Sequence, residues 1–392
     1  IFDSRSALAS IEIALALVLL VGSGLMLKSL GNLLAVSPGF TPQGVLSMRF
    51  NAPEGTPRDS ATAFYNQVVE RISALPGVSA VTLQDCPPLG GGCNATAAVR
   101  RDRPESDVSA KLDVGVHWVS PNWASVMGVP LKKGRTFDGG DRAGRQKVVM
   151  VSETAAKRLW PNEEALGKPV SVYQGGFDTD TAFVIGVVGD LRYGTVDSLS
   201  HPDFYLSYLQ SARTRMMIMV RTSGDPLAMA PHVRAALREV APELPLYDIR
   251  TMESRISDST SYARFATMLL SLFGSVALLL AALGTYGVIA YSVSQRTREI
   301  GIRVALGATA QQVARMIVAH GLGIAAVGGV VGIVVAIATT RVLQSLLFDV
   351  TATDPTTFAA IVVVLVGCAA AASWIPARRA ARIQPTEALR QD

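Results

Sequence analysis

Long apolar stretches divide this chain into membrane-spanning and water-exposed parts. Three of them carry no charged side chain and cover residues 265–295, 316–340 and 355–377. The hydrocarbon core of a bilayer is about 30 Å thick, and a helix needs about 20 apolar residues to cross it. A fourth candidate covers residues 7–27 and is interrupted only by Glu12. The pattern predicts a membrane protein with one span before a long polar segment and three spans after it.

The first apolar stretch could also be a signal peptide, because Arg5 precedes it. It has no small-residue cleavage site, so we expect a retained membrane anchor. The chain begins with Ile1 instead of Met, which suggests that it is a piece of a longer protein.

The second span is longer than a bilayer requires. As one helix, residues 265–294 would extend for about 45 Å at about 1.5 Å per residue, which is roughly 15 Å more than the hydrocarbon core. Tilt could absorb part of the excess. A helix that continues out of the membrane into the polar segment is the simpler explanation, and such a rigid connection would transmit motion.

The polar segment is predicted to contain both helices and strands. Two similar strand–helix–strand units lie near its ends, with strands at 45–50 and 78–83 and at 216–221 and 246–249. In the first unit, Ser60 can cap the helix. Its apolar positions recur at helical spacing and are Phe64, Val68, Ile72 and Leu75. The two units together predict a split βαβ subdomain.

The middle of the polar segment has a different pattern. Valine-rich runs at 147–151 and 183–188 are typical of buried strands, and Ser152 can cap a short helix that ends at Trp160 and Pro161. We expect a second subdomain with more β-structure. The predicted fold class is therefore a membrane protein of four helices, one plus three, with a large α+β extracytoplasmic domain of two subdomains.

The placement of charge is more informative than the formal net charge of +5. Residues 38–264 hold 25 Lys and Arg against 24 Asp and Glu, so most of the basic surplus lies beside the spans. This distribution argues against a nucleic-acid surface and fits orientation by the positive-inside rule. The predicted domains are the first span with its flanks (1–37), the extracytoplasmic domain (38–264) and the three further spans with their loops and tail (265–392).

The orientation follows from the loops between the spans. The loop at 296–315 carries four arginines against one glutamate, and the tail at 378–392 carries four arginines against two acidic residues. The loop between the third and fourth spans instead carries two aspartates. We expect both termini and the 296–315 loop in the cytoplasm and the polar segment outside. Lys28 opposes this orientation, but a lone lysine can snorkel to either interface.

The most specific local feature is residues 295–313, with the sequence QRTREIGIRVALGATAQQV. As a helix this segment is amphipathic, because Ile300 and Val304, and likewise Ile302 and Leu306, lie at i, i+4 spacing with charged residues between them. One explanation is a basic helix that simply rests on lipid headgroups.

The run REIGIRVALGAT at 298–309 also resembles the cytoplasmic motif of FtsX-like permeases, the membrane part of MacB-type ABC transporters. The tail at 375–390 resembles the ending of that family, with Gln384 where Asp is common. In the polar segment, residues 127–131 and 134–137, Asp141 and residues 152–167 resemble the MacB-type periplasmic core. Together these similarities cover nearly the whole chain, in the order and with the one-plus-three span layout of the family.

The resemblance implies an efflux or envelope-export permease of a bacterial inner membrane. Such permeases work as a dimer, or as paired halves fused in tandem, with a separate ABC ATPase, and some also with a periplasmic adaptor and an outer-membrane channel. The family is thought to convert ATP hydrolysis into movement of the outer domain. In the family the short helix of the first cytoplasmic loop docks on the nucleotide-binding subunit. By position, this assigns coupling to Arg298, Glu299, Ile300, Gly301, Arg303 and Gly307.

Other candidate sites are weaker. The sequence has no G-x-x-x-x-G-K-[ST] motif, so a partner or a segment not included here would hydrolyse ATP. No Cys/His cluster has metal-binding spacing, and no cofactor is expected. Cys86 and Cys93 flank a glycine-rich turn and could form a disulfide. Gly328 and Gly332 could bring two helices close together, although glycines in a membrane helix do not require this role.

Ionisable residues give no sign of an enzyme. Glu12 and His320 lie near the predicted span ends, where snorkelling is sufficient to keep their polar groups in water. His117, His201 and His232 have no triad partner at a recognisable spacing.

Two other functions stay open. A membrane sensor usually needs a sizeable cytoplasmic output domain, and the predicted inner segments are short. A scaffold that regulates cell-wall hydrolases, as some FtsX relatives do, tends to have a smaller outer domain. The sequence does not indicate which substance a transporter of this type would carry.

Overall fold

The computed structural model describes residues 4–53, 56–90, 94–104, 107–172, 181–195, 201–211 and 213–381. The chain divides into two compact units. A helical unit combines Ile1–Ala35 with Ser261–Asp392, and a mixed α/β unit consists of Val36–Thr260. The mixed unit is therefore one continuous insertion between the first two long helices of the helical unit.

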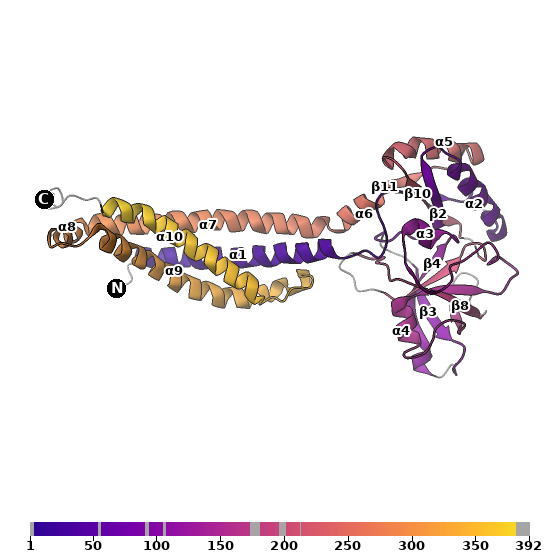
Figure 1. The fold of residues 1–392 in the computed structure, drawn as a ribbon, viewed down its shortest axis with the longest axis horizontal. Helices are drawn as coiled ribbons and strands as arrows, with labels where there is room; N and C mark the ends of the chain where they lie inside the picture. Colours follow the sequence, from indigo (N-terminus) through magenta and orange to yellow (C-terminus); the bar gives the residue numbers. More distant parts are fainter. Residues whose placement is uncertain are drawn as a thin grey trace. The chain divides into compact units, whose positions relative to one another are not determined.

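Four long helices build the helical unit (Figure 1). They are α1 (Ser4–Ala35), α7 (Ser261–Gln295), α9 (Ala310–Thr340) and α10 (Pro355–Ala380). Each is long and apolar enough to cross a membrane, which confirms the four predicted spans in their one-plus-three order. The short helix α8 (Thr297–Ala305) connects α7 to α9, and the 3₁₀ helix η3 (Val342–Leu346) follows α9.

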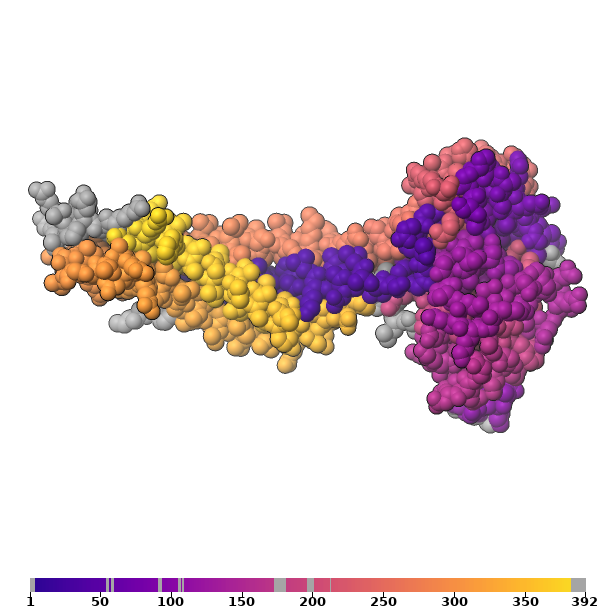
Figure 2. All heavy atoms as spheres, in the orientation of Figure 1, coloured from indigo at the N-terminus to yellow at the C-terminus, as the bar shows by residue number. Residues whose placement is uncertain are grey.

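Helix α1 is the most enclosed of the four. It packs against α7, α9 and α10, and in the space-filling view it reaches the surface of this unit only in part (Figure 2). Its buried residues Ile13, Leu17, Val21 and Leu25 recur every four positions, which aligns them along one side of the helix. Large side chains of α7, such as Phe273, are instead exposed, as expected for a surface that meets lipid.

The second span is as long as predicted, but the prediction that it continues into the polar segment as one helix is wrong. α7 has 35 residues, and at about 1.5 Å per residue it is about 52 Å long. It begins at Ser261, directly after the last residue of the mixed unit. Thr260 separates it from α6 (Met252–Ser259), so a break between two helices, and not one uninterrupted helix, lies at the border of the units.

One half of the mixed unit is the predicted split βαβ arrangement. The strands follow the order β11-β1-β10-β2, all antiparallel, so that β10 separates β1 from β2. The helices α2 and α5 pack against each other beside this sheet. The elements are β1 (Val45–Asn51), α2 (Arg58–Ser73), β2 (Val78–Gln84), β10 (Arg215–Thr222), α5 (Ala230–Val240, after the 3₁₀ turn η2, Leu227–Met229) and β11 (Tyr247–Thr251).

The predicted start of α2 is wrong by three residues. The helix begins at Arg58 with Pro57 in the N-cap position, and Ser60 lies inside its first turn. The φ of −58° at Pro57 suits the residue that precedes a helix, so this proline sets the start.

The other half of the mixed unit is the predicted β-rich part, and its strands close into a ring. Pairing runs β4-β3-β7-β8-β6-β9 and returns from β9 to β4 through a parallel pair. β5 adds to the outside of β8, and the single pair Gln84↔Val119 joins the ring to the other half. The strands are β3 (Asn94–Arg100), β4 (Lys111–Val119), β5 (Leu131–Gly134), β6 (Val148–Ser152), β7 (Pro169–Val172), β8 (Ala182–Val188) and β9 (Asp203–Ser207).

Short helices complete the mixed unit. They are η1 (Val108–Ala110), α3 (Trp123–Met127) and α4 (Glu153–Leu159). As predicted, Ser152 caps α4, since its hydroxyl accepts a hydrogen bond from the Ala155 amide.

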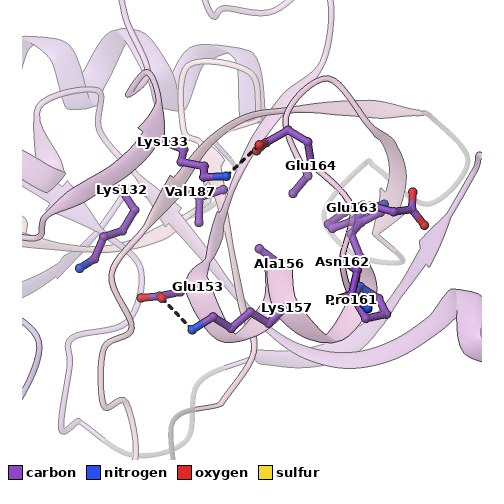
Figure 3. Close-up of a pocket in the computed structure, with 12 residues that line it drawn as sticks. Lys132, Lys133, Glu153, Ala156, Lys157, Pro161, Asn162, Glu163, Glu164 and Val187 are labelled. Carbon is purple, nitrogen blue, oxygen red and sulfur yellow. Dashed lines mark hydrogen bonds and ion pairs between the residues drawn. The ribbon is translucent and has the colours of Figure 1, made fainter.

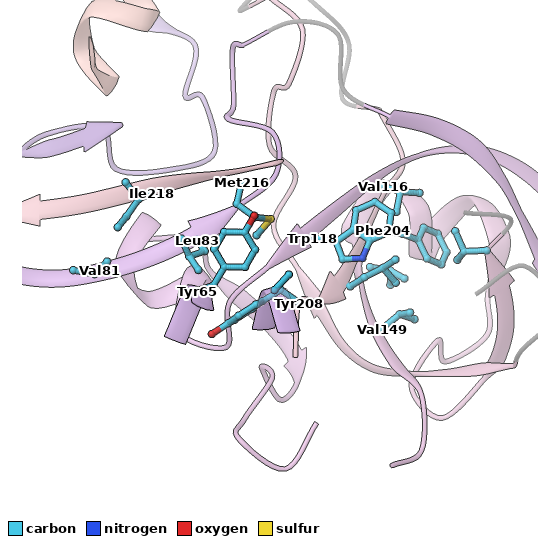
Figure 4. Close-up of a cluster of buried hydrophobic side chains, with 14 of the residues drawn as sticks. Tyr65, Val81, Leu83, Val116, Trp118, Val149, Phe204, Tyr208, Met216 and Ile218 are labelled. Carbon is cyan, nitrogen blue, oxygen red and sulfur yellow. The ribbon is translucent and has the colours of Figure 1, made fainter. Parts of the chain in front are cut away.

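One hydrophobic core runs through both halves of the mixed unit (Figure 4). Tyr65 and Ile218 lie in the split βαβ half, whereas Trp118, Val149 and Phe204 lie among the strands of the ring. Each of these five side chains is 0% exposed. Burying a side chain of the size of Phe contributes about 1.5–3 kcal/mol, so this core holds the two halves together as one unit.

Candidate functional site

Local capping signals define both ends of α8, the helix that contains the predicted coupling residues. Gly307 adopts a φ of +97°, and its amide donates to the Val304 carbonyl at 3.0 Å while the Ala308 amide donates to the Arg303 carbonyl at 2.9 Å. This pair of bonds is the Schellman motif, in which glycine tolerates the left-handed conformation that ends a helix. Gly307 therefore has a terminating role.

The next helix starts almost at once. Thr309 caps α9 in a capping box, because its hydroxyl accepts from the Gln312 amide and the Gln312 side chain accepts from the Thr309 amide at 2.9 Å. A capping box satisfies two amides that would otherwise lack partners at a helix start. The turn between α8 and α9 is therefore short and well defined.

The inner face of α8 is fixed in the helical unit. Ile300 is 2% exposed, and Gly301 is also buried. Ile300 belongs to a cluster with Ile289 of α7, Ile317 of α9 and Ala377 of α10, together with Val313 and Ala380. Three of the long helices thus contribute to the cluster that holds the inner face of α8, in which Ile300 is the buried side chain and Val304 is partly buried.

The outer face of α8 combines charge with exposed apolar surface. Glu299 and Arg303 form an ion pair at 2.6 Å, and both are about half-exposed, at 50% and 49%. Arg298 is exposed as well. Ile302 and Leu306 are 45% and 84% exposed, although both are large apolar residues. The predicted coupling residues therefore separate into an exposed group and the buried pair Ile300 and Gly301.

Ile302 and Leu306 are not among the residues that the family resemblance assigns to coupling. Their i, i+4 spacing is visible in the sequence, but it is identical to that of Ile300 and Val304. Spacing alone does not tell which of two apolar pairs faces the protein. An exposed apolar pair between arginines can insert into a groove on a partner or into a lipid interface.

Arginines and tyrosines surround the same end of the helical unit. The Arg5 guanidinium lies 3.8 Å from the centre of the Tyr291 ring, and Arg379 Nη1 donates to the Tyr286 hydroxyl at 3.2 Å. Tyrosine and basic residues are enriched where membrane helices meet the headgroup layer.

At the opposite end of the helical unit, Lys28 has an acidic partner. Its ammonium lies 2.8 Å from both carboxylate oxygens of Asp354 and 2.9 Å from the Thr356 hydroxyl. The Lys28 ammonium, followed by the hydroxyls of Thr357 and Thr356, holds the pKa of Asp354 well below its usual range. Lys28 therefore has a specific counter-ion and does not depend on snorkelling.

The glycines predicted to pack helices lie between α9 and α1. A methyl group built on Gly328 would lie 2.9 Å from Ile13 Cβ, and one built on Gly332 would lie 3.0 Å from Ala14 Cα. Both distances are shorter than ordinary contacts between carbon atoms. A side chain at either position would have to push the two helices apart.

The remaining candidate sites are the cysteine pair, a metal site and Glu12. Cys86 is buried, and Cys93 lies outside the described residues, so their disulfide stays a prediction. Among the described residues, no group of three or more His, Cys, Asp or Glu side chains could hold a metal ion. Glu12 is half-buried with its carboxylate against Gly284 of α7.

His117 has a partner that the sequence spacing did not reveal. Its Nε2 lies 3.0 Å from Asp203 Oδ1, and its ring stacks on Tyr193 with the ring centres 3.6 Å apart. His117 and Asp203 are 0% and 1% exposed. Burial also raises the pKa of Tyr193 well above its ordinary value. A pair enclosed in this way is inaccessible to a substrate, so it is part of the structure of the core.

The mixed unit also contains a cavity of about 390 Å³ beside α4 and β5 (Figure 3). Two ion pairs face each other across it, Lys133 with Glu164 at 2.8 Å and Lys157 with Glu153 at 2.8 Å. Because these charges neutralise each other, the cavity does not select a ligand by charge.

Comparisons with known proteins agree with these features. The model of the MacB-like periplasmic core domain matches residues 13–240, and that of the FtsX-like permease C-terminal domain matches residues 271–385. A macrolide export ATP-binding/permease protein MacB of Azoarcus is 27% identical over 99% of this chain and 57% of its own length. An uncharacterized ABC transporter permease, YknZ of Bacillus subtilis, is 23% identical over 72% of this chain and 71% of its own.

Coverage limits what these relatives imply. The chain spans about half the length of the MacB relatives it matches, 57% and 54% for the first two. The crystal structure of the periplasmic region of MacB from Actinobacillus actinomycetemcomitans is 17% identical and covers 57% of this chain and 95% of that one, with a TM-score of 0.39. The family models, not this structural overlap, are therefore the basis for assigning the family.

Proposed function

This chain belongs to the family of ABC transporter permeases with a MacB-like periplasmic core domain and an FtsX-like permease domain, and we propose that α8 is the element on which an ABC ATPase acts. In this proposal the chain is the non-catalytic membrane part of an export system. A separate subunit or domain hydrolyses ATP, and the hydrolysis moves the periplasmic core region.

The observation that carries the proposal is the two-sided character of α8. Its inner face is locked into α7, α9 and α10 through Ile300, and its outer face presents Ile302 and Leu306 beside Arg298 and Arg303. A helix that is rigidly attached on one side passes a displacement to the helices behind it. Covering a side chain such as Leu306 in a partner's groove stabilises the contact by about 1.5–3 kcal/mol.

The orientation and partners follow from the same proposal. The arginine-rich end with α8 and both termini would face the cytoplasm, where the positive-inside rule favours basic residues. The Val36–Thr260 unit would lie in the periplasm. A second permease copy or a fused permease half would complete the assembly, and a periplasmic adaptor with an outer-membrane channel would extend it. Export of a macrolide is the activity that the names of the MacB relatives suggest.

The test is to replace Leu306 with Asp in the full protein and to purify it from its native membrane with the ATPase that accompanies the wild type. We expect this ATPase to be lost, or its hydrolysis no longer to respond to the permease. Val342→Asp is the matched control, because Val342 is 79% exposed at the other end of the helical unit.

Retention of a responsive ATPase by the Leu306→Asp protein would overturn the proposal. So would recovery of a kinase or a cell-wall hydrolase, and no ATPase, with the wild type. The first of these partners would indicate a sensor and the second a scaffold.

A further inference from the structure

A cavity of about 340 Å³ lies beneath α8, between the end of α7 and the first turns of α9. Its floor is apolar and includes Ile289, Ile300 and Ile317, all of which are buried. Its rim carries Arg296 and His320, both exposed. The cavity is therefore amphipathic, with basic side chains at its rim and an apolar floor.

The position of the cavity fits the boundary between lipid chains and headgroups. Its residues come from the last two turns of α7, from α8 and from the second and third turns of α9. Tyr286 and Tyr291, which contact Arg379 and Arg5, lie on the same part of α7. Tyrosines at this depth are typical of the headgroup level.

The charges at the rim are unbalanced. Among the residues that the structure describes, no carboxylate lines the cavity, and Glu299, the one acidic residue of α8, is engaged by Arg303. Within the part of the chain that the structure describes, the Arg296 and His320 side chains have no hydrogen bond and no ion pair. A guanidinium in this situation favours a phosphate, which accepts charge-assisted hydrogen bonds.

We propose that this cavity binds an anionic phospholipid of the surrounding membrane. The phosphate accepts hydrogen bonds from Arg296 and from His320, and the first part of an acyl chain lies on the isoleucine floor. A zwitterionic lipid fits less well, because none of the described residues that line the cavity is a carboxylate that could receive its ammonium group. Free phosphate would leave the apolar floor uncovered. Since Ile300 belongs to both the floor and the cluster that holds α8, a bound lipid braces this helix.

The experiment titrates the purified full protein in detergent with phosphatidylglycerol and counts bound lipids by native mass spectrometry. Arg296→Gln removes the main phosphate donor and should weaken binding about tenfold, the effect of one strong charge-assisted contact. Ala319→Trp keeps every charge but fills the cavity, because Ala319 is exposed and lines it, and should also abolish binding.

Arg315→Gln is the matched control, since Arg315 is exposed on α9 at the same end but does not line the cavity. It should bind within about twofold of the wild type. Phosphatidylcholine and inorganic phosphate should both fail to displace phosphatidylglycerol. Equal loss in the Arg315 and Arg296 variants would reduce the site to general surface charge and overturn the proposal.

Two further results would also overturn it. Displacement by inorganic phosphate would mean a free-anion site, and unchanged binding in the Ala319→Trp protein would mean that the lipid lies elsewhere. Melting temperatures of the variants identify any loss that comes from misfolding. The measurement needs no ATPase, so its outcome is independent of the function proposed for α8.

Discussion

The two ends of the helical unit differ in how many of their side chains stay exposed and unbonded. At the end with η3, Lys28 pairs with Asp354, the Ser29 hydroxyl accepts from the Phe348 amide at 2.8 Å, and Asn32 donates to the Asp349 carbonyl at 3.0 Å. At the end with α8, cationic side chains are exposed around an exposed leucine. Polar contacts join helices at this second end too, since Arg379 bonds to Tyr286 and Arg5 stacks on Tyr291. The outer face of α8 differs, because Arg298, Ile302 and Leu306 stay exposed and are available to partners.

At the end with η3, one carboxylate makes several of these bonds. Asp354 bonds to Lys28 and thereby joins the start of α10 to α1. It also caps α10, because it accepts from the Thr357 amide at 2.9 Å and from the Thr357 hydroxyl at 2.6 Å. Nothing comparable fixes the outer face of α8, which is held from within by Ile300.

The largest effect should come from removing that internal anchor. Ile300→Ala deletes a buried side chain from the cluster beneath α8, and truncations of this kind cost about 2–5 kcal/mol in well-packed cores. Thermal unfolding of the purified protein in detergent should shift accordingly. Ile302→Ala is the control, because it removes the same atoms from the exposed face, and equal destabilisation by both would contradict the two-sided character of α8.

A smaller effect is expected between the two ends, where α9 approaches α1. Gly328→Leu inserts a side chain where even a methyl group would meet Ile13, and overpacking of this kind costs about 1–3 kcal/mol. Gly329→Leu should be nearly neutral, because no atom lies within 4 Å of the position its Cβ would take. If both variants unfold at the same temperature, Gly328 does not set the spacing of the helices.

The smallest effect on stability should follow from breaking the Lys28–Asp354 ion pair at the end with η3. Asp354→Asn removes the counter-ion of Lys28 at the surface, where ion pairs contribute modestly. The pKa of Asp354 is lowered in the folded protein, so its stabilisation is present above the ordinary carboxyl pKa of about 3.9 and is lost as the pH falls through the folded value.

This sign gives a specific expectation for the pH dependence. In detergent at pH 7, the Asp354→Asn variant should unfold at a lower temperature than the wild type. This difference in unfolding temperature should shrink as the pH falls below about 4. Asp349→Asn is the control, since Asp349 has a φ of +50° that asparagine also tolerates. A difference that grows in acid would rule out the ion pair as its source.

Features that depend on neighbouring residues in the chain were predictable. The apolar runs gave the four spans, and a serine before a helical pattern gave the start of α4. The same reasoning failed at Ser60, because Pro57 a few residues earlier starts α2. Local patterns compete with one another, and the stronger backbone constraint prevails.

Features that join distant residues were not predictable. His117 and Asp203 form a buried pair across 86 positions, and Lys28 finds Asp354 across 326. Nothing in the spacing of these residues marks them as partners. The closed ring of strands has the same origin, since the parallel pairing of β9 with β4 is visible only when the sheet is complete.

By itself the sequence determined that the chain has four helices long and apolar enough to span a membrane and that Ser152 starts α4, because hydrophobic length and capping residues act locally. Only the tertiary structure decided which face of α8 is anchored and which is free. Ile300 and Ile302 are equivalent in pattern, and the difference arises because α7, α9 and α10 converge on one of them.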